Sequence, residues 1–408
     1  MDSSQAGTAD SHAPVVQAAR EPAWGFVLLL GAMIALTSIS TDLYLPALPA
    51  MARELQASPI EVQATLAAFL AGMAGSQLFY GPLSDRIGRR PVLLLGIAIY
   101  VVGTLACGFA WSIPTLVAAR FIQALGACAA HVVPRALVRD RFDVRVSAQV
   151  FSRLTIATSV APMLGPLLGG YLVTAFHWRS VFLVPAVCAV LVGGLIFARV
   201  EETLHRADML RARKEPVLRS FVALLGQRRL VGFLLCGAFN ASAFFAYLTA
   251  APELLMQVYQ IPPRRFGAVF AVNALGFMVA NQINARLLRH YGPLTILHHA
   301  RPATIALGVA LLVAAYSGAF GMYGVLVSLF FVLSTGGLIG PNTSACALQL
   351  DPQRAGSISS LIGLCAFALG AAVALLIGAL QNGTPQPMAL VIFGCMLAST
   401  FSLHVIAR

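Results

Sequence analysis

Residues 355–407 read AGSISSLIGLCAFALGAAVALLIGALQNGTPQPMALVIFGCMLASTFSLHVIA, a stretch without a single Asp, Glu, Lys or Arg. A helix needs about 20 apolar residues, at about 1.5 Å each, to cross the hydrocarbon core of a bilayer. The polar turn at 381–387 divides the stretch, which therefore holds two such helices. The charge-free stretch between Arg301 and Asp351 holds two more, separated by the turn at 316–321. These stretches identify a protein that spans a membrane with helices.

The composition of the whole chain agrees with this interpretation. Of its 408 residues, 59% are hydrophobic and 10% are charged, whereas a soluble domain carries about 25% charged residues. Apolar runs of about 20 residues, rather than short alternating strands, exclude a transmembrane β-barrel. We predict an all-α polytopic membrane protein of twelve transmembrane helices. The predicted spans cover residues 24–50, 60–81, 91–110, 113–137, 148–175, 178–199, 228–257, 265–286, 293–316, 321–350, 355–380 and 387–407.

The net charge of +12 suggests nucleic-acid binding, but the positions of the basic residues argue against it. With the N-terminus in the cytoplasm, only Arg53, Arg179, Arg264 and Arg265 fall on the outer side, and Arg120 lies within a span. The remaining Lys and Arg residues gather in or beside cytoplasmic segments, which is the positive-inside distribution. We therefore expect both termini in the cytoplasm and no nucleic-acid partner.

Signals of catalytic or metal chemistry are missing from the sequence. The seven cysteines lie in or at the edges of apolar spans without CxxC spacing, which favours buried apolar side chains over disulfides or metal ligands. The chain has no Gly-rich phosphate loop, HExxH motif or nucleophile elbow. We expect no enzymatic activity and no metal site.

The chain repeats itself at half its length. The loop after the second predicted span reads LSDRIGRRP from Leu83, and the loop after the eighth reads LLRHYGPLT from Leu287. Gly88 and Gly292 keep the same spacing of 204 residues. Two repeats of six spans with a binding site between them are a common transporter architecture. We predict a disordered cytoplasmic tail, an N-terminal six-helix half, a cytoplasmic linker and a C-terminal six-helix half over residues 1–23, 24–199, 200–227 and 228–408.

The first of these loops resembles a family motif. Residues 81–90, GPLSDRIGRR, closely resemble the loop-two motif of the major facilitator superfamily, usually written GxLaDrxGrr. We expect Gly81 and Pro82 to end one helix and Gly88 to permit a tight turn. Asp85 can pair with arginines or cap a helix N-terminus. The alternative is a short loop that only obeys the positive-inside rule. The resemblance implies a cytoplasmic gate formed by Gly81, Asp85, Arg86, Gly88, Arg89 and Arg90.

Two further stretches resemble motifs of the same superfamily. RFIQALG from Arg120 is similar to RxxQGxG, with Ala124 in place of the first Gly, and GPLLGG at 165–170 is similar to the core of the antiporter motif GxxxGPxxGG. Small residues at this spacing let helices approach closely, so ordinary membrane packing is an alternative for the second stretch. In the superfamily this motif is typical of exporters rather than importers, and the resemblance assigns it here to Gly165, Pro166, Gly169 and Gly170.

The first span resembles one group within the superfamily. TDLYLPALP from Thr41 is similar to the signature TDxYLPxLP of the Bcr/CflA group of bacterial drug/proton antiporters, and PRALVRD from Pro134 is also typical of that group. The resemblance implies a monomer of the major facilitator fold in the bacterial inner membrane. It implies export of bicyclomycin-, chloramphenicol- or sulfonamide-like drugs, or of small metabolites, driven by the proton gradient without a cofactor.

Two charges lie well inside the predicted spans, Asp42 and Arg120. A charge near the bilayer centre costs about 2.5–3.5 kcal/mol on insertion scales, so each should face the bundle interior and serve a function. We predict that Asp42 carries the proton and that its separation from Arg120 changes during transport. A static ion pair that locks two helices is the alternative.

Further polar and aromatic residues of the spans are candidates for the cavity or the proton path. Amide pairing between helices or histidine packing explains several of them equally well. We expect Glu253 to be a gate residue near the outer end of its span, and a second proton site is the alternative for it. These candidates are Tyr44, Gln123, His131, Asn240, Phe244, Tyr247, Glu253, Asn273 and Asn342.

Two other functions remain open from the sequence. The same gate and the same carboxylate would serve a proton-coupled importer, or an exporter of a metabolite. A membrane sensor without transport activity is the more distant alternative.

Overall fold

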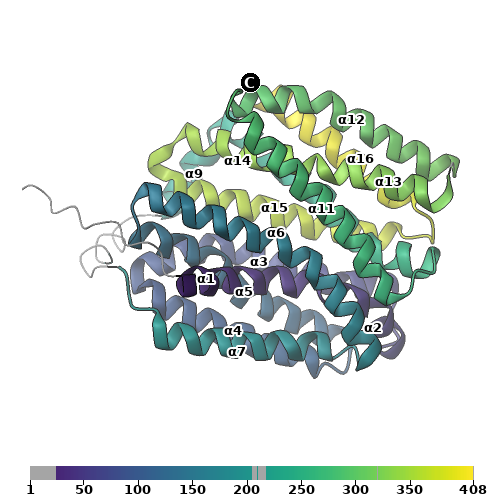
Figure 1. Ribbon diagram of the computed structural model, residues 1–408, viewed down its shortest axis with the longest axis horizontal. Helices are drawn as coiled ribbons and strands as arrows, with labels where there is room; N and C mark the ends of the chain where they lie inside the picture. Colours follow the sequence, from purple (N-terminus) through teal and green to yellow (C-terminus); the bar gives the residue numbers. More distant parts are fainter. Residues whose placement is uncertain (1–23, 205–208, 210–216, 319, 408) are drawn as a thin grey trace, which may run out of the picture.

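The computed structural model describes residues 24–204, 209, 217–318 and 320–407. The predicted tail, 1–23, and much of the predicted linker lie outside these residues. Every regular element within them is helical, and Figure 1 shows two helical bundles that lie side by side. The predicted all-α class is confirmed.

The first bundle contains the elements up to Arg199. They are α1 (Trp24–Asp42), η1 (Leu45–Ala47), α2 (Leu48–Glu54), α3 (Pro59–Ile87), α4 (Arg89–Gly108), α5 (Ile113–Arg141), α6 (Val144–Ala175) and α7 (Ser180–Arg199). The second bundle contains α9 (Val217–Leu225), α10 (Arg228–Pro252), η2 (Glu253–Val258), α11 (Pro263–Leu287), α12 (Pro293–Ser317), α13 (Gly321–Ser334), α14 (Gly336–Leu350), η3 (Pro352–Arg354), α15 (Ala355–Leu380), α16 (Gln386–Phe401) and η4 (Ser402–Ile406).

Eleven helical segments within the described part of the chain are long and apolar enough to cross a membrane. The predicted span 148–175 lies in α6, a helix of 32 residues whose described apolar stretch, Val160–Ala175, is shorter than the other eleven segments. The chain is a multi-pass membrane protein.

The first span is not the continuous helix predicted over 24–50. Helix α1 ends at Asp42, and the chain passes through η1 before α2 begins at Leu48. Pro46 and Pro49 explain the interruption, because proline donates no backbone hydrogen bond and its ring clashes with the preceding turn. The predicted span 321–350 is likewise divided between α13 and α14, beside two consecutive glycines.

The predicted end of the second span at Gly81 and Pro82 is also wrong. Helix α3 continues through Pro82 to Ile87, where Gly88 adopts a φ of 106°. Pro82 lacks a backbone N–H, which removes one hydrogen bond and leaves the others of the helix intact. A positive φ, by contrast, ends the helix, and glycine adopts it readily. The tight turn predicted at Gly88 is therefore confirmed, six residues after the predicted helix end.

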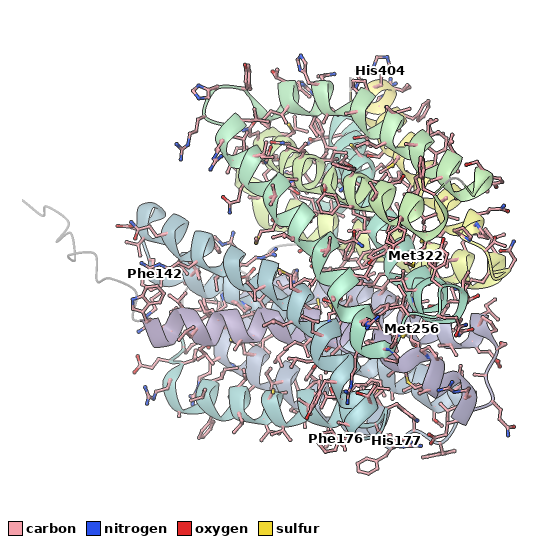
Figure 2. The ribbon with its side chains drawn as sticks, turned by 45° about the vertical axis from the view of Figure 1, so that its right-hand side comes forward. Phe142, Phe176, His177, Met256, Met322 and His404 are labelled. Carbon is pink, nitrogen blue, oxygen red and sulfur yellow. The ribbon has the colours of Figure 1, made fainter. Side chains whose placement is uncertain are left out.

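Two helix pairs join the bundles, α3 with α15 and α6 with α11. In Figure 1 and Figure 2, α6 and α11 approach one another toward the end of the molecule that carries α2. A Cβ atom on Gly267 would overlap the backbone of Leu167, and Gln63 Nε2 donates a hydrogen bond across the interface to the carbonyl oxygen of Thr249 at 2.9 Å. The backbones of the two bundles are in direct contact.

The internal repeat extends to the backbone conformation. Gln56 and Gln260, 204 residues apart, have φ values of 52° and 53°, a conformation uncommon outside glycine. Pro59 and Pro263, at the same spacing, begin α3 and α11. The repeat predicted from the loops at the other end of these helices therefore has a structural counterpart.

Part of the predicted linker belongs to the second bundle. Helix α9 places Phe221 and Leu224 in an apolar cluster with residues of α10, α12, α14 and α15. This helix forms because apolar residues recur at helical spacing in VLRSFVALL. The domain boundaries at 199 and 228 remain predictions.

Candidate functional site

Asp42 occupies the interruption of the first span. It is the last residue of α1 and is 3% exposed, and its Oδ1 accepts a hydrogen bond from Thr41 Oγ1 at 3.1 Å. Helix α6 packs directly on this point: a Cβ atom on Gly165 would lie 2.8 Å from Asp42 Cβ, and one on Gly169 would overlap the carbonyl group of Leu43. The antiporter-like stretch, predicted from a separate motif, therefore packs against the chain at Asp42 and Leu43.

Arg120 is completely buried on α5, beside the same interruption. Its Nη1 donates to the carbonyl oxygen of Ser40 at 2.9 Å and to Gln123 Oε1 at 2.6 Å. Gln123 is held in turn by Thr104, whose Oγ1 accepts from Gln123 Nε2 at 2.9 Å. Within the described residues Arg120 forms no ion pair with Asp42, so a static pair does not lock α1 to α5 in this conformation.

Aromatic rings surround the Arg120 guanidinium. Its central carbon lies 4.2 Å from the ring centroid of Tyr44 and 4.4 Å from that of Phe69. The negative faces of aromatic rings attract a cation, and the attraction strengthens where water is excluded. Tyr44, a candidate for the cavity, is therefore one wall of the Arg120 site.

His131 joins the two bundles rather than the Arg120 cluster. Its ring meets the ring of Phe367 on α15 edge to face, at 6.2 Å between centroids. Phe367 also contacts Phe245 of α10, at 6.0 Å. The structure thus places His131 at an aromatic contact between the bundles.

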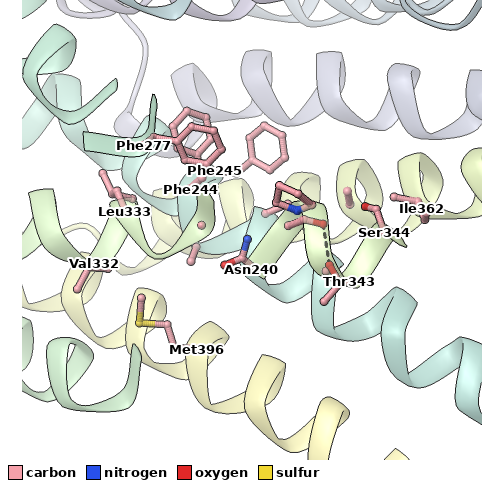
Figure 3. A pocket seen from close by; sticks show the side chains of 17 residues that line it. Asn240, Phe244, Phe245, Phe277, Val332, Leu333, Thr343, Ser344, Ile362 and Met396 are labelled. Carbon is pink, nitrogen blue, oxygen red and sulfur yellow. Dashed lines mark hydrogen bonds between the residues drawn. The ribbon is translucent and has the colours of Figure 1, made fainter. Parts of the chain in front are cut away.

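The second bundle contains a cavity of about 360 Å³. Figure 3 shows Asn240, Phe244, Phe245 and Phe277 around it, with Met396 on its far side. None of the side chains that line it is charged. Ligand cavities of about 300–1,000 Å³ with apolar walls and a few polar groups are typical of small-molecule sites. Two of the predicted cavity residues, Asn240 and Phe244, therefore line a cavity of suitable size and chemistry.

Three other candidates tie helices together. Asn273 Nδ2 donates to Tyr247 Oη at 2.9 Å, which connects α11 to α10. Asn342 Nδ2 donates to Asn284 Oδ1 at 2.6 Å, which connects α14 to α11. Amide pairing between helices, the alternative considered for these residues, is the arrangement that the structure shows.

Glu253 begins η2 and lies half-buried against a second cavity, of about 550 Å³, between the two bundles. The cavity lies beside α2 and the C-terminal end of α10. Trp24, at the start of α1, and Arg228, at the start of α10, lie at the other end of the molecule. Figure 2 shows Met256, which lines it, well away from Phe142 and His404. The role of Glu253 as a gate residue remains a prediction.

The loop-two motif forms a network around Arg89. The Arg89 guanidinium binds Asp85 Oδ1 at 2.5 Å, Asp140 Oδ2 at 2.8 Å and Ser84 Oγ at 2.6 Å. The predicted pairing of Asp85 with an arginine is therefore present. Asp140, from the PRALVRD stretch, joins α5 to this network.

Arg90 binds the C-terminal end of α7. Its Nη2 donates to the carbonyl oxygen of Phe197 at 2.8 Å, and its guanidinium carbon lies 5.2 Å from the Phe197 ring centroid. The arrangement fixes the start of α4 against the end of α7.

Glu202 is a member of this network that the sequence did not reveal. Its carboxylate accepts the backbone N–H groups of Arg89 at 2.9 Å and Arg90 at 3.1 Å, and so caps the positive end of α4. A Cβ atom on Gly88 would overlap this carboxylate. Gly88 is therefore required for the approach of Glu202 as well as for the turn, and no local pattern links residues more than 110 positions apart.

Glu202→Gln should lower the thermal stability of the purified protein, because the neutral amide loses the charge that faces the start of α4. A helix cap of this kind is worth about 1 kcal/mol. Glu201→Gln is the matched control, since it removes the same charge one position earlier. Equal melting temperatures for the two variants would contradict the capping role.

The model of the Major Facilitator Superfamily matches residues 28–375. The chain belongs to this superfamily. A bicyclomycin resistance protein homolog of Haemophilus influenzae is 31% identical over 379 residues, which cover 93% of this chain and 95% of the relative. The uncharacterized MFS-type transporter YdgK of Bacillus subtilis is 33% identical and covers 90% of this chain and 91% of its own. The multidrug resistance protein MdtL of Shigella dysenteriae is 28% identical over 83% of this chain and 84% of its own.

Solved structures of the major facilitator superfamily have the same fold. A D-xylose-proton symporter superposes with a TM-score of 0.76 at 13% identity, over 94% of this chain and 97% of that one. An inward-facing bacterial homolog of the lysosomal transporter Spinster gives a TM-score of 0.67 at 16% identity, over 94% and 95% of the two chains. The protein is thus a transporter of the major facilitator superfamily rather than an enzyme, and the names of its relatives agree with the resemblance to the Bcr/CflA group.

Proposed function

We propose that the protein exports small drugs across the bacterial inner membrane in exchange for protons, by alternating access, with both termini in the cytoplasm. The observation that carries the proposal is the position of Asp42. The side chain of Asp42 is buried at a helix interruption, it forms no ion pair with Arg120, and its Cβ atom and the Leu43 backbone pack against Gly165 and Gly169 of the antiporter-like stretch. Discontinuous helices near the middle of a membrane form the ion and substrate sites of many transporters.

The substrate class follows from the cavity of the second bundle. Its aromatic walls and its uncharged lining suit a neutral or amphipathic molecule that carries a ring, oriented by the Asn240 amide. Names such as bicyclomycin resistance and multidrug resistance among the relatives support a drug as the substrate.

The proton and the drug occupy different bundles in this proposal. Asp42 and Arg120 belong to the first bundle, and the uncharged cavity belongs to the second. Helix α6 touches both Asp42 and α11 through its glycines. Protonation of Asp42 therefore acts on the helix that contacts the other bundle, which couples the two sites through the relative position of the bundles.

Inverted membrane vesicles test this function. We expect such vesicles to accumulate labelled chloramphenicol when a proton gradient, acidic inside, is imposed, and to lose the accumulation when an uncoupler is added. Trypsin added outside should cleave the arginine-rich segment 200–227, because inverted vesicles expose the cytoplasmic face. If right-side-out vesicles, but not inverted ones, accumulated the drug, export would be wrong.

A further inference from the structure

The cavity of about 550 Å³ between the bundles lies apart from both sites of the proposed function. Elements α2 and α3 of the first bundle and η2 of the second form its walls. Gln260, one of the two residues with the repeated left-handed turn, is part of its rim. The cavity therefore opens where the two halves of the repeat face one another.

The acidic and basic side chains that line this cavity differ in their exposure to solvent. Glu253 is its one acidic lining residue and is half-buried, whereas Arg53, its one basic lining residue, is exposed. Water screens an exposed charge more strongly than a partly buried one. The field inside the cavity is therefore dominated by the carboxylate and favours a cation.

Gln63 adds an unpaired acceptor to the same wall. Its side chain is 4% exposed, and its Nε2 is bound to the carbonyl oxygen of Thr249. Its Oε1 is buried and has no hydrogen-bond partner among the described residues. A buried acceptor without a donor is unfavourable, so this atom indicates a donor that the described residues do not supply.

We infer that this cavity binds a small organic cation that carries a protonated amine. The ammonium group would donate to the Glu253 carboxylate and to Gln63 Oε1, the two acceptors described above. Leu48 and Met256, buried beside them in the same lining, would contact the apolar part of the molecule. The inference rests on the proposed function in one respect: an amine-bearing drug would occupy this site last, before release to the outside.

Calorimetric titration of the purified full-length protein tests the site. The probes are phenethylammonium and its neutral analogue 2-phenylethanol, which have the same ring and chain. We expect phenethylammonium to bind at least about tenfold more tightly, because a charge-assisted hydrogen bond is stronger than a neutral one. Glu253→Gln should remove that difference and leave the affinity for 2-phenylethanol unchanged.

Three variants separate this site from other sources of the same signal. Arg53→Gln should tighten phenethylammonium binding, because it removes the opposing charge from the rim. Glu61→Gln, which removes an acid from the same face outside the cavity, should have no effect. Asp42→Asn should retain the preference for the amine, and loss of the preference in Asp42→Asn but not in Glu253→Gln would overturn the inference.

The inference and the proposed function fail in different measurements. If inverted vesicles accumulate chloramphenicol but Glu253→Gln leaves amine binding unchanged, the outer site is wrong and the export function stands. If Glu253→Gln abolishes amine binding while no variant or wild-type vesicle transports drug, the site stands and the export function is wrong.

Discussion

Asp42→Asn should abolish proton-driven efflux while the protein still binds a neutral drug. Asparagine keeps the shape of aspartate at the end of α1 but cannot gain or lose a proton, so the gradient no longer favours either conformation. The electrical part of moving one charge inward is worth about 2.3 kcal/mol per 100 mV, and the variant loses it. Neutral-drug affinity should survive, because the uncharged cavity of the second bundle does not include this residue.

Drug-induced proton release from purified protein in detergent is the deciding measurement, alongside efflux from cells. The matched control is Asp143→Asn. Asp143 caps the start of α6 through the backbone N–H of Val146, and asparagine caps as well as aspartate does. Wild-type proton release from Asp42→Asn would move the carrier to another residue, with Glu253 and His131 next to be tested.

Gly170→Ala should reduce efflux at least about fivefold, because it acts on the contact between the bundles. A Cβ atom at this position would overlap the carbonyl oxygen of Pro263 at the start of α11. Overpacking of this kind costs about 1–3 kcal/mol, and the cost falls on the conformation in which α6 and α11 touch. The variant should therefore favour the conformation in which the outer ends of the bundles are apart.

Labelling of a cysteine introduced at Gln260 measures that shift, because Gln260 is exposed on the rim of the cavity between the bundles. Gly170→Ala should increase its rate of reaction with a membrane-impermeant maleimide. Gly194→Ala is the matched control, since a Cβ atom there has no neighbour within 4 Å. Unchanged labelling together with wild-type efflux would show that the α6–α11 contact does not govern the cycle.

The sequence was sufficient for the helices but not for their interruptions. A span must satisfy its backbone hydrogen bonds within itself, so a charge-free stretch of sufficient length predicts a helix. The break after Asp42 lies inside a predicted span, and the break at Thr335 lies inside the charge-free stretch between Arg301 and Asp351. Neither break divides a long apolar segment into two spans. A proline, in turn, does not always end a helix. We predicted that Pro82 would end the second span, but it lies inside α3.

The candidate site was predictable where it depended on the cost of burying a charge. Asp42 and Arg120 were identified because a charge inside the membrane is expensive, and both are buried. Their lack of an ion pair depends on the direction of each side chain, which no spacing in the chain determines. The same holds for Glu202 and Gln63, whose partners belong to elements more than 110 residues away.

The paired turns at Gln56 and Gln260 bear on how the two halves have diverged. The five residues around them share only the glutamine and the final proline, LQASP in one half and YQIPP in the other, yet the two glutamines have nearly the same positive φ. The side chains of the two halves differ at a position of the loop-two motif, since Arg289 occupies the place in the second half that corresponds to Asp85. The backbone of this protein therefore retains the similarity of the two halves better than its side chains do. A search for the duplication that produced them should compare torsion angles before residue identities.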